Sequence, residues 1–476
     1  MTDRKFNKTE IKKLAKQVVA EKKGAWEQCR ASEKKEIFKY AEHYMAFLSM
    51  VKTEREAVDF IRKEAMSRRF REPGKGGSKK LFWSFRGKSA ALAVTGARPV
   101  SEGIRIVASH IDAPRLDLKP NPLYEDMEMA FLKTHYYGGI KKFQWLCRPL
   151  AIHGLFIKGD GEELNLVMGE DESGPVFTIN DLLPHLAGKV QATKKLREAI
   201  PGEKLNLLVG GIPINGPVGT KEKIKLSILE LLNRKYGLTE HDFTCAEIEI
   251  VPAGRAREIG FDRAFVGGYG QDDRSCAYAS LKALFETVSP EYTCVALFLD
   301  KEETGSDGNT GAKSRFIEKI IFDLVRNEGT ELRPDSLTNI FFNSLAISAD
   351  VTAGMDPDYM DVHEKNNDAM IGHGISLSKY TGSGGKYSAN DANAEYLSWI
   401  RQVWNRAGVA WQAGEMGKVD EGGGGTIAKH LAAHGMEVVD AGTPLLSMHS
   451  PFEIAHKADL YMTFRAYHAF FSAHGE

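Results

Sequence analysis

The chain has 476 residues, 42% of them hydrophobic, which is enough for two or three compact units or for one large domain with an insertion. Its 63 Lys and Arg residues nearly balance 64 Asp and Glu residues, and the formal net charge of −1 gives no global field that would attract nucleic acid or an anionic membrane. No run of about 18 apolar residues occurs, so the sequence predicts no transmembrane helix. We therefore expect a local site to carry the function.

The five cysteines indicate a reducing compartment. They are scattered, odd in number and without a Cys-x-x-Cys pair, which argues against a thiolate zinc site or a disulfide framework. Residues 1–16 are basic and polar and lack the apolar segment of a secretory signal. These features predict a cytoplasmic protein.

The first part of the chain combines helix and strand patterns. Residues 8–66 are predicted to be helical from the spacing of their apolar side chains, and residues 81–94 and 104–109 are predicted to form strands. The second strand runs into the motif His110-x-Asp112. Residues two apart on an extended chain share one side, so Asp112 can orient His110.

The middle of the chain differs in character. Between residues 116 and 253, shorter alternating segments and glycine turns indicate a β-rich insertion, with one helix predicted over residues 221–235. We expect this insertion to interrupt an α/β domain made of residues 1–115 and 254–476. We also expect it to stand apart from the core chemistry.

Beyond the insertion, each apolar strand-like segment is followed by an acid or a histidine. Helices are predicted over residues 275–288, 310–326 and 452–471. The residues that follow the strand-like segments are Asp272, the pair Glu302-Glu303, Asp350 and His449. Because ligands bind at the carboxyl ends of strands in open α/β sheets, we expect these side chains and His110 to meet in one crevice.

The adjacent acids Glu302 and Glu303 are the centre of this pattern. An isolated Glu-Glu pair is ordinarily a solvated turn, since charged residues are mostly exposed. On an extended backbone, however, neighbouring side chains point to opposite sides, so the two carboxylates can have different roles.

Imidazoles and carboxylates without thiols are the ligands for a pair of borderline divalent ions, zinc first, with manganese or cobalt as alternatives. One adjacent glutamate would bind metal and its neighbour would take the proton from the attacking water. This chemistry is the hydrolysis of an amide or an ester.

The motifs that hold these residues resemble the aspartyl aminopeptidase family of dinuclear zinc exopeptidases from about residue 80 onward, and residues 351–357 and 381–385 resemble its bacterial branch. The motifs are Ser109-His110-Ile111-Asp112-Ala113-Pro114-Arg115-Leu116-Asp117, Gly270-Gln271-Asp272-Asp273, Asp300-Lys301-Glu302-Glu303-Thr304-Gly305-Ser306, Ile347-Ser348-Ala349-Asp350 and Ser447-Met448-His449-Ser450.

The resemblance implies an α/β fold with a zinc-exopeptidase-like mixed sheet flanked by helices, and it implies that the β-rich insertion is a dimerisation domain. It also implies two metal ions per subunit and a role for each motif residue. In these roles His110 and Asp350 bind one metal, Glu303 and His449 bind the other, Asp272 bridges them, Glu302 is the general base and Asp112 orients His110.

The resemblance further implies removal of an N-terminal Asp or Glu from peptides, with Lys379 and Tyr387 near the acidic side chain. It implies dimers that assemble into a tetrahedral dodecamer. His185 resembles the family histidine that reaches a neighbouring subunit's active site, with a solvated loop histidine as the alternative.

Two other functions fit part of the pattern. A catalytically silent metal-binding assembly protein would keep the metals for stability alone, but such a site has no use for Glu302 as an unligated base. A two-metal amidohydrolase or deacylase acting on small amides would use the same framework, and the motifs alone do not separate it from an aminopeptidase.

Overall fold

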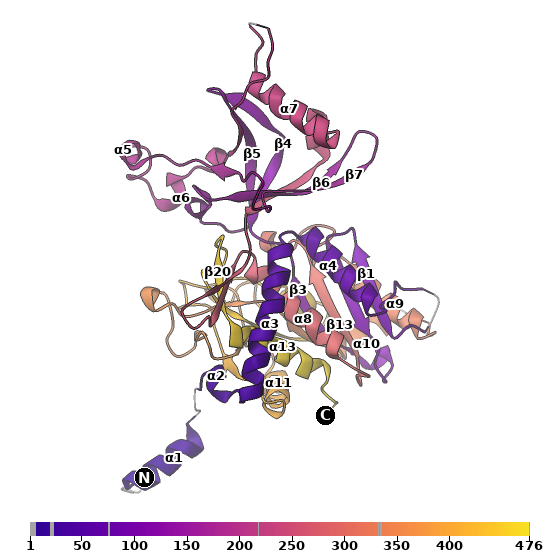
Figure 1. Ribbon diagram of the computed structural model, residues 1–476. Coiled ribbons are helices and arrows are strands. Elements are labelled where there is room, and N and C mark those ends of the chain that lie inside the picture. Colours follow the sequence, from indigo (N-terminus) through magenta and orange to yellow (C-terminus); the bar gives the residue numbers. More distant parts are fainter. Residues whose placement is uncertain are drawn as a thin grey trace.

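The computed structural model describes residues 6–19, 23–74, 77–217, 219–331, 333 and 336–475. Figure 1 shows two bodies, a lower one that contains both ends of the chain and an upper one built from the middle of the sequence. In the described part of the chain, no helix is both long and apolar enough to cross a membrane.

The lower body is organised around a mixed sheet. Its strands, in chain order, are β1 (Lys80–Phe85), β2 (Ser89–Val94), β3 (Ile104–His110), β13 (Thr293–Leu299), β14 (Leu345–Ser348), β16 (Ile375–Ser378), β17 (Trp411–Ala413) and β18 (Glu437–Gly442). Among the described residues their spatial order is β1-β2-β13-β3-β14-β18-β16-β17. The four central strands β13, β3, β14 and β18 are parallel, so their carboxyl ends lie at one edge.

Helices cover both faces of this sheet, and for that reason the parallel strands are apolar along nearly their whole length. One face packs against α3 (Ala31–Met50), α4 (Glu54–Ser67), α8 (Gln271–Glu286), α11 (Ala394–Arg406) and α13 (Lys457–Phe471). The other face packs against α9 (Phe316–Asn327), α10 (Ser336–Phe342) and α12 (Ala428–Ala432). Two further helices, α1 (Lys8–Val18) and α2 (Ala25–Gln28), precede α3.

A second, smaller sheet belongs to the lower body. It contains β11 (Arg257–Ile259), β12 (Phe265–Gly268), β15 (Thr352–Ala353), β19 (Pro444–Leu446) and β20 (Glu453–His456). The described strands follow the order β11-β12-β20-β19-β15. β12 leads into α8 and β19 leads toward His449, so this sheet positions two of the predicted site residues.

The upper body is a separate antiparallel sheet with its own hydrophobic core. Its strands are β4 (Arg115–Asp126), β5 (Met129–Tyr137), β6 (Leu150–Ile157), β7 (Glu163–Met168), β8 (Thr178–Ile179), β9 (Leu207–Gly210) and β10 (Glu247–Pro252), and its helices are α5 (Pro184–Ala187), α6 (Leu196–Ala199) and α7 (Lys223–Tyr236). The predicted fold class, a mixed α/β sheet flanked by helices with a β-rich insertion, is confirmed.

Some predicted helices begin later than the sequence suggested. The helix predicted over residues 310–326 starts at Phe316, after turns that include Gly311. The helix predicted over residues 452–471 starts at Lys457, because the preceding residues pair as β20 between β12 and β19. The predicted helical stretch of residues 8–66 is divided into four helices, and its residues 20–22 lie outside the described chain.

Candidate metal centre

The structure brings the five predicted metal ligands together at the junction of the two sheets in the lower body. His110 is the last residue of β3, Glu303 lies in a short 3-10 turn after β13, and Asp350 follows β14 by two residues. His449 comes from the loop after β19, whereas Asp272 lies in the first turn of α8 rather than at a strand end.

One half of the site contains His110 and Asp350. His110 Nε2 lies 3.4 Å from Asp350 Oδ1. Together with Asp272, these residues form a group whose potential ligand atoms all lie within 4.8 Å of one another.

The other half contains His449 and Glu303. His449 Nε2 lies 3.0 Å from Asp272 Oδ2 and 3.3 Å from Glu303 Oε1. Because Asp272 belongs to both of these groups, its carboxylate could bridge two ions.

The buried carboxylates of the site lack compensating positive charge. Burial raises the pKa of Glu303 well above its usual range, and the carboxylates of Asp272 and Asp273 raise it further. Glu303 Oε1 is buried without a hydrogen-bond donor. Although burial lowers the pKa of His449, Asp272 raises it to about 10. Zinc or a similar divalent ion would supply the missing positive charge to these nitrogen and oxygen donors, so the residues fit such ions.

Asp112 organises the turn that carries the two glutamates. Its carboxylate accepts the backbone N–H of Glu302 at 3.0 Å and that of Glu303 at 3.2 Å. Its Oδ1 also lies 3.7 Å from His110 Nδ1. Burial raises the pKa of Glu302 to about 8, against the opposing effect of His110. Among the described residues, Glu302 belongs to none of the potential ligand groups.

Two acids at the site were not singled out from the sequence. Asp273, beside Asp272, is buried with both carboxylate oxygens lacking a hydrogen-bond partner, and its Oδ1 lies 3.7 Å from His110 Nδ1. Glu453 is 1% exposed and accepts the backbone N–H of His449 at 2.7 Å and that of Asp272 at 3.3 Å. A second acid next to Asp272 was a visible signal for Asp273, but nothing local marked Glu453.

The expectation that the insertion stands apart from the core chemistry is wrong. At the end of β5, Tyr137 donates a hydrogen bond to Asp112, and the carbonyl of Gly139 lies 3.0 Å from His449 Nδ1. The chain leaves the lower body after β3 but returns to the site at these residues.

A small cavity of about 70 Å³ adjoins Asp350. Its charged lining includes Lys386, Lys418, Glu415 and Asp440. The predicted substrate residues do not line it: Lys379 is exposed, and Tyr387 is 74% exposed.

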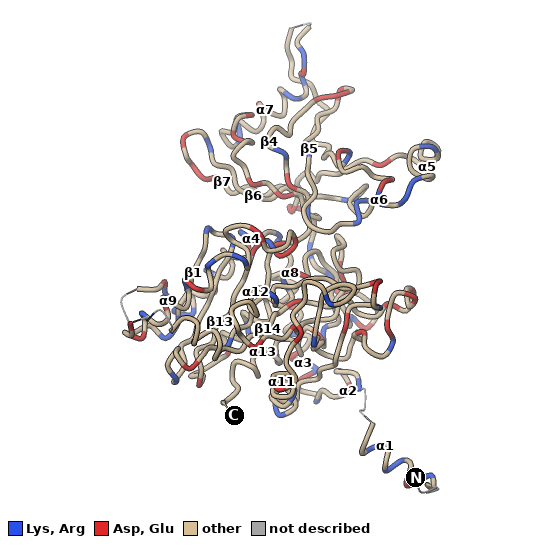
Figure 2. Tube along the Cα trace, turned by 180° about the vertical axis from the view of Figure 1, so that it is seen from behind, with Lys and Arg blue, Asp and Glu red and all other residues tan. Residues whose placement is uncertain are grey.

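His185 is also exposed, in α5 at the outer side of the insertion (Figures 1 and 2), and the structure does not bring it to the metal ligands of its own chain.

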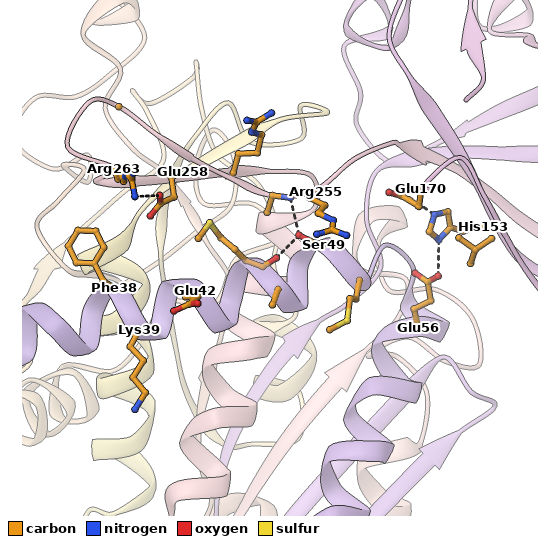
Figure 3. Close-up of a pocket in the computed structure, with 17 residues that line it drawn as sticks. Phe38, Lys39, Glu42, Ser49, Glu56, His153, Glu170, Arg255, Glu258 and Arg263 are labelled. Carbon is orange, nitrogen blue, oxygen red and sulfur yellow. Dashed lines mark hydrogen bonds and ion pairs between the residues drawn. The ribbon is translucent and has the colours of Figure 1, made fainter. Parts of the chain in front are cut away.

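A larger cavity of about 1290 Å³ lies elsewhere, along α3 (Figure 3). At one end of it His153 binds Glu56 at 2.7 Å and Glu170 at 3.3 Å. His153 lies on β6 and Glu56 on α4, so this contact joins the insertion to the lower body. None of the potential metal-ligand groups of the described residues lies there.

Comparison with known proteins identifies the family. The profile of the family described as Aminopeptidase I zinc metalloprotease (M18) matches residues 47–471. The chain belongs to the M18 family of aminopeptidases. An M18 relative from Clostridium acetobutylicum, named probable M18 family aminopeptidase 1, is 47% identical over 464 residues, covering 95% of this chain and 98% of the relative.

Solved M18 structures share the fold. The crystal structure of an M18 family aminopeptidase from Thermotoga maritima matches with a TM-score of 0.91 at 45% identity, covering 95% of this chain and 99% of that one. A yeast (S. cerevisiae) mApe1 dodecamer matches with a TM-score of 0.73 at 21% identity, covering 91% of this chain and 96% of that one. The predicted family and enzyme class are confirmed: the protein is a metal-dependent M18 aminopeptidase.

Proposed function

We propose that this M18 aminopeptidase binds two divalent ions, zinc in the first place and manganese or cobalt as substitutes, and removes N-terminal residues with a preference for Asp and Glu. His110 and Asp350 would hold one ion, Glu303 and His449 the other, and Asp272 both. When bound, such ions supply a nucleophilic hydroxide near neutral pH by lowering the pKa of water from about 15.7 to about 7, and they polarise the scissile carbonyl.

The observation that carries this proposal is the different placement of two adjacent glutamates on one turn. Asp112 holds the backbone N–H groups of both Glu302 and Glu303, but only Glu303 belongs to a ligand group of the described residues. Glu302 is therefore free to take a proton from the attacking water and to pass it to the leaving amine.

The test compares two matched variants. Glu302→Gln should keep about two ions per chain by elemental analysis while kcat falls about 10²–10⁴-fold, the usual contribution of general acid–base catalysis. Glu303→Gln should instead lose metal. An active Glu302→Gln enzyme would overturn the assigned base.

The acidic preference draws on cations close to Asp350. Lys386 and Lys418 line the adjoining cavity, and Lys379 precedes Lys386 in the sequence. A cation near the substrate side chain would favour Asp and Glu.

Rates on a series of dipeptides that differ only in their N-terminal residue would measure this preference. If Lys379→Ala loses the preference for Asp and Glu, the assigned subsite is supported. If only Lys386→Ala loses this preference, the acidic side chain binds in the cavity instead. Faster hydrolysis of acylated amino acids than of dipeptides would favour the deacylase alternative.

We also propose that the insertion mediates self-association into dimers and, from them, a tetrahedral dodecamer, in which His185 reaches a neighbouring site. The insertion leaves several large apolar side chains exposed, which is typical of an interaction surface. They include Met127 at 83%, Val176 at 52%, Leu186 at 62%, Leu196 at 62% and Ile212 at 80%. Sedimentation velocity would measure the assembly, and a monomer at micromolar concentration would contradict it.

A further inference from the structure

Three consecutive residues of the insertion, Tyr137, Gly138 and Gly139, lie against the candidate metal centre, where Tyr137 contacts Asp112 and Gly139 contacts His449. We propose that this contact segment positions the metal-site groups, and hence that the insertion completes the active site of its own chain. The inference rests on the two-metal centre proposed above.

Tyr137 acts on Asp112, the residue that holds the turn of Glu302 and Glu303. Its hydroxyl donates to Asp112 Oδ2 at 2.7 Å, and the same carboxylate accepts the N–H groups of Glu302 and Glu303. Asp112 is fully buried, so loss of the phenol donor would not be replaced easily by bulk water. The hydroxyl thus helps to fix the carboxylate that shapes the Glu302-Glu303 turn.

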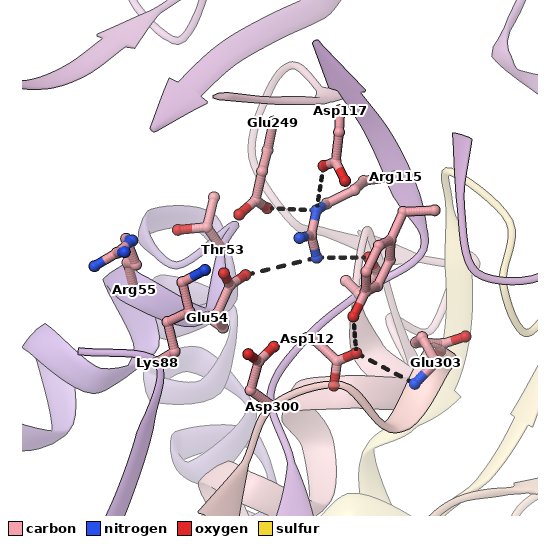
Figure 4. A network of polar contacts seen from close by, with 12 residues as sticks. Thr53, Glu54, Arg55, Lys88, Asp112, Arg115, Asp117, Glu249, Asp300 and Glu303 are labelled. Atoms are coloured by element: carbon pink, nitrogen blue, oxygen red, sulfur yellow. Dashed lines mark hydrogen bonds and ion pairs between the residues drawn. The ribbon is translucent and has the colours of Figure 1, made fainter. Parts of the chain in front are cut away.

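The ring of Tyr137 is itself held in place. The Arg115 guanidinium lies 3.9 Å from the ring centroid. Figure 4 shows Arg115 between Asp117 and Glu249, at 2.8 Å and 3.1 Å from its Nε, with Asp112 and Glu303 below it. The ion pairs of Arg115 therefore fix the position from which the insertion presents the Tyr137 phenol.

Gly139 acts on the half that contains His449. With a proton on Nδ1, His449 donates to the Gly139 carbonyl at 3.0 Å, which leaves Nε2 as the nitrogen that faces Asp272 and Glu303. Carbonyl partners of this kind fix the tautomer and the ring orientation of a metal-binding histidine.

The close approach of the segment explains its two glycines. A Cβ on Gly138 would lie 3.0 Å from Glu303 Oε2, and its φ of 71° also disfavours other residues. A Cβ on Gly139 would lie 3.3 Å from His449 Nδ1. Even alanine at Gly139 would push against the imidazole.

The first test uses Tyr137→Phe in the full-length protein, with Tyr136→Phe as the matched control on the same strand. Tyr136 is 43% exposed, and its hydroxyl makes no hydrogen bond to the metal-site residues described above. Cobalt titrations followed by absorbance measure ion binding, and steady-state kinetics separate kcat from KM. Loss of a hydrogen-bond partner that lies behind the metal ligands typically costs about 10–100-fold in metal affinity or activity.

We expect Tyr137→Phe to lose about 10–100-fold in cobalt affinity or in kcat, with KM and the thermal unfolding midpoint close to those of Tyr136→Phe. The second test uses Gly139→Ala, with Gly159→Ala as control because a Cβ there meets nothing within 4 Å. Gly139→Ala should lower the affinity for one cobalt ion by about tenfold or more and change the absorption spectrum of that ion.

The outcomes separate the two proposals. If the unmodified protein binds no cobalt, the proposed two-metal centre fails. If it binds cobalt and both Tyr137→Phe and Gly139→Ala match their controls, the metal centre stands and the positioning role is overturned. Should Tyr137→Phe not fold, Gly139→Ala decides the question by itself.

Discussion

Asp112 Oδ1 accepts the backbone N–H of Glu302 at 3.0 Å, so it holds the main chain that carries the proposed base rather than the base's side chain. Asp112→Asn should therefore misplace the turn without removing any proposed ligand. We expect kcat to fall about 10–100-fold, less than the loss expected for Glu302→Gln. Steady-state kinetics beside elemental analysis would check this, and a kcat equal to that of the unmodified enzyme would contradict it.

Chelation should remove both activity and stability. The buried carboxylates around Glu303 lack a compensating cation when the ions are absent: burial raises the pKa of Glu303 well above its usual range, and the carboxylates of Asp272 and Asp273 raise it further. We expect the unfolding midpoint to fall on treatment with a chelator and both properties to return with zinc, manganese or cobalt. Calorimetry with and without added metal measures the effect, and magnesium serves as the control for a non-specific ion response.

The histidine at the start of α13 should make stability depend on pH. Burial lowers the pKa of His456 from 6.5 to about 4, and its Nδ1 accepts the Ala458 N–H as a helix cap. Between these values the unfolded chain binds a proton that the folded protein does not. The contribution of His456 to the free energy of unfolding is therefore fully present above about pH 6.5 and is lost as the pH falls through 4. The change amounts to about 3 kcal/mol.

His456→Asn keeps a side-chain cap without this titration. Its unfolding free energy should fall less than that of the unmodified protein between pH 7 and pH 4.5, as followed by urea denaturation. Equal pH dependence in the two proteins would refute the assignment. Other titrating groups are common to both proteins and cancel in the difference.

Arg115 should be among the costliest charged residues to replace. It is 5% exposed and faces Glu54, Asp117 and Glu249, of which Glu54 and Glu249 are also buried. Arg115→Met would leave those buried acids uncompensated, at a cost of about 3–5 kcal/mol. Urea denaturation at neutral pH would measure it.

Arg55→Met is the control for this prediction, because Arg55 pairs with the more exposed Glu247. Its cost should be about 1 kcal/mol or less. Adding Glu249→Gln to Arg115→Met should recover part of the lost stability. No recovery, or equal costs for the two arginines, would argue against the buried network.

The sequence contained much of the candidate site because its ligands follow apolar strands. Buried parallel strands are recognisable as apolar runs, and the first polar residue after each run falls at the shared sheet edge. This reasoning placed His110, Glu303 and Asp350 near one another, as they lie in the structure. It did not anticipate that Asp272 and His449 come from a second sheet and the helix beside it.

The extended geometry predicted for the glutamate pair is wrong. Glu302 and Glu303 lie in a 3-10 turn between Lys301 and Gly305, which have φ of 72° and 88°, and not on an extended chain. About three residues per turn separate neighbouring side chains by about 120°, which still gives the two acids different surroundings.

Contacts across long sequence separations left no local signal. Tyr137 and Asp112 are 25 positions apart, and His449 and Gly139 are 310 apart. No periodicity or motif of β5 marks Tyr137 as a partner of Asp112, because its apolar neighbours satisfy an ordinary strand pattern. Such partners emerge only when the fold places the insertion over the site.

The order in which the site residues are synthesised decides when the proposed metal centre can form. Gly139, Asp272, Glu303 and Asp350 all precede His449, which comes after β19. On the proposed assignment, a growing chain therefore lacks one ligand until the segment that follows β19 has been made. The centre is complete only when that segment joins residues synthesised long before it.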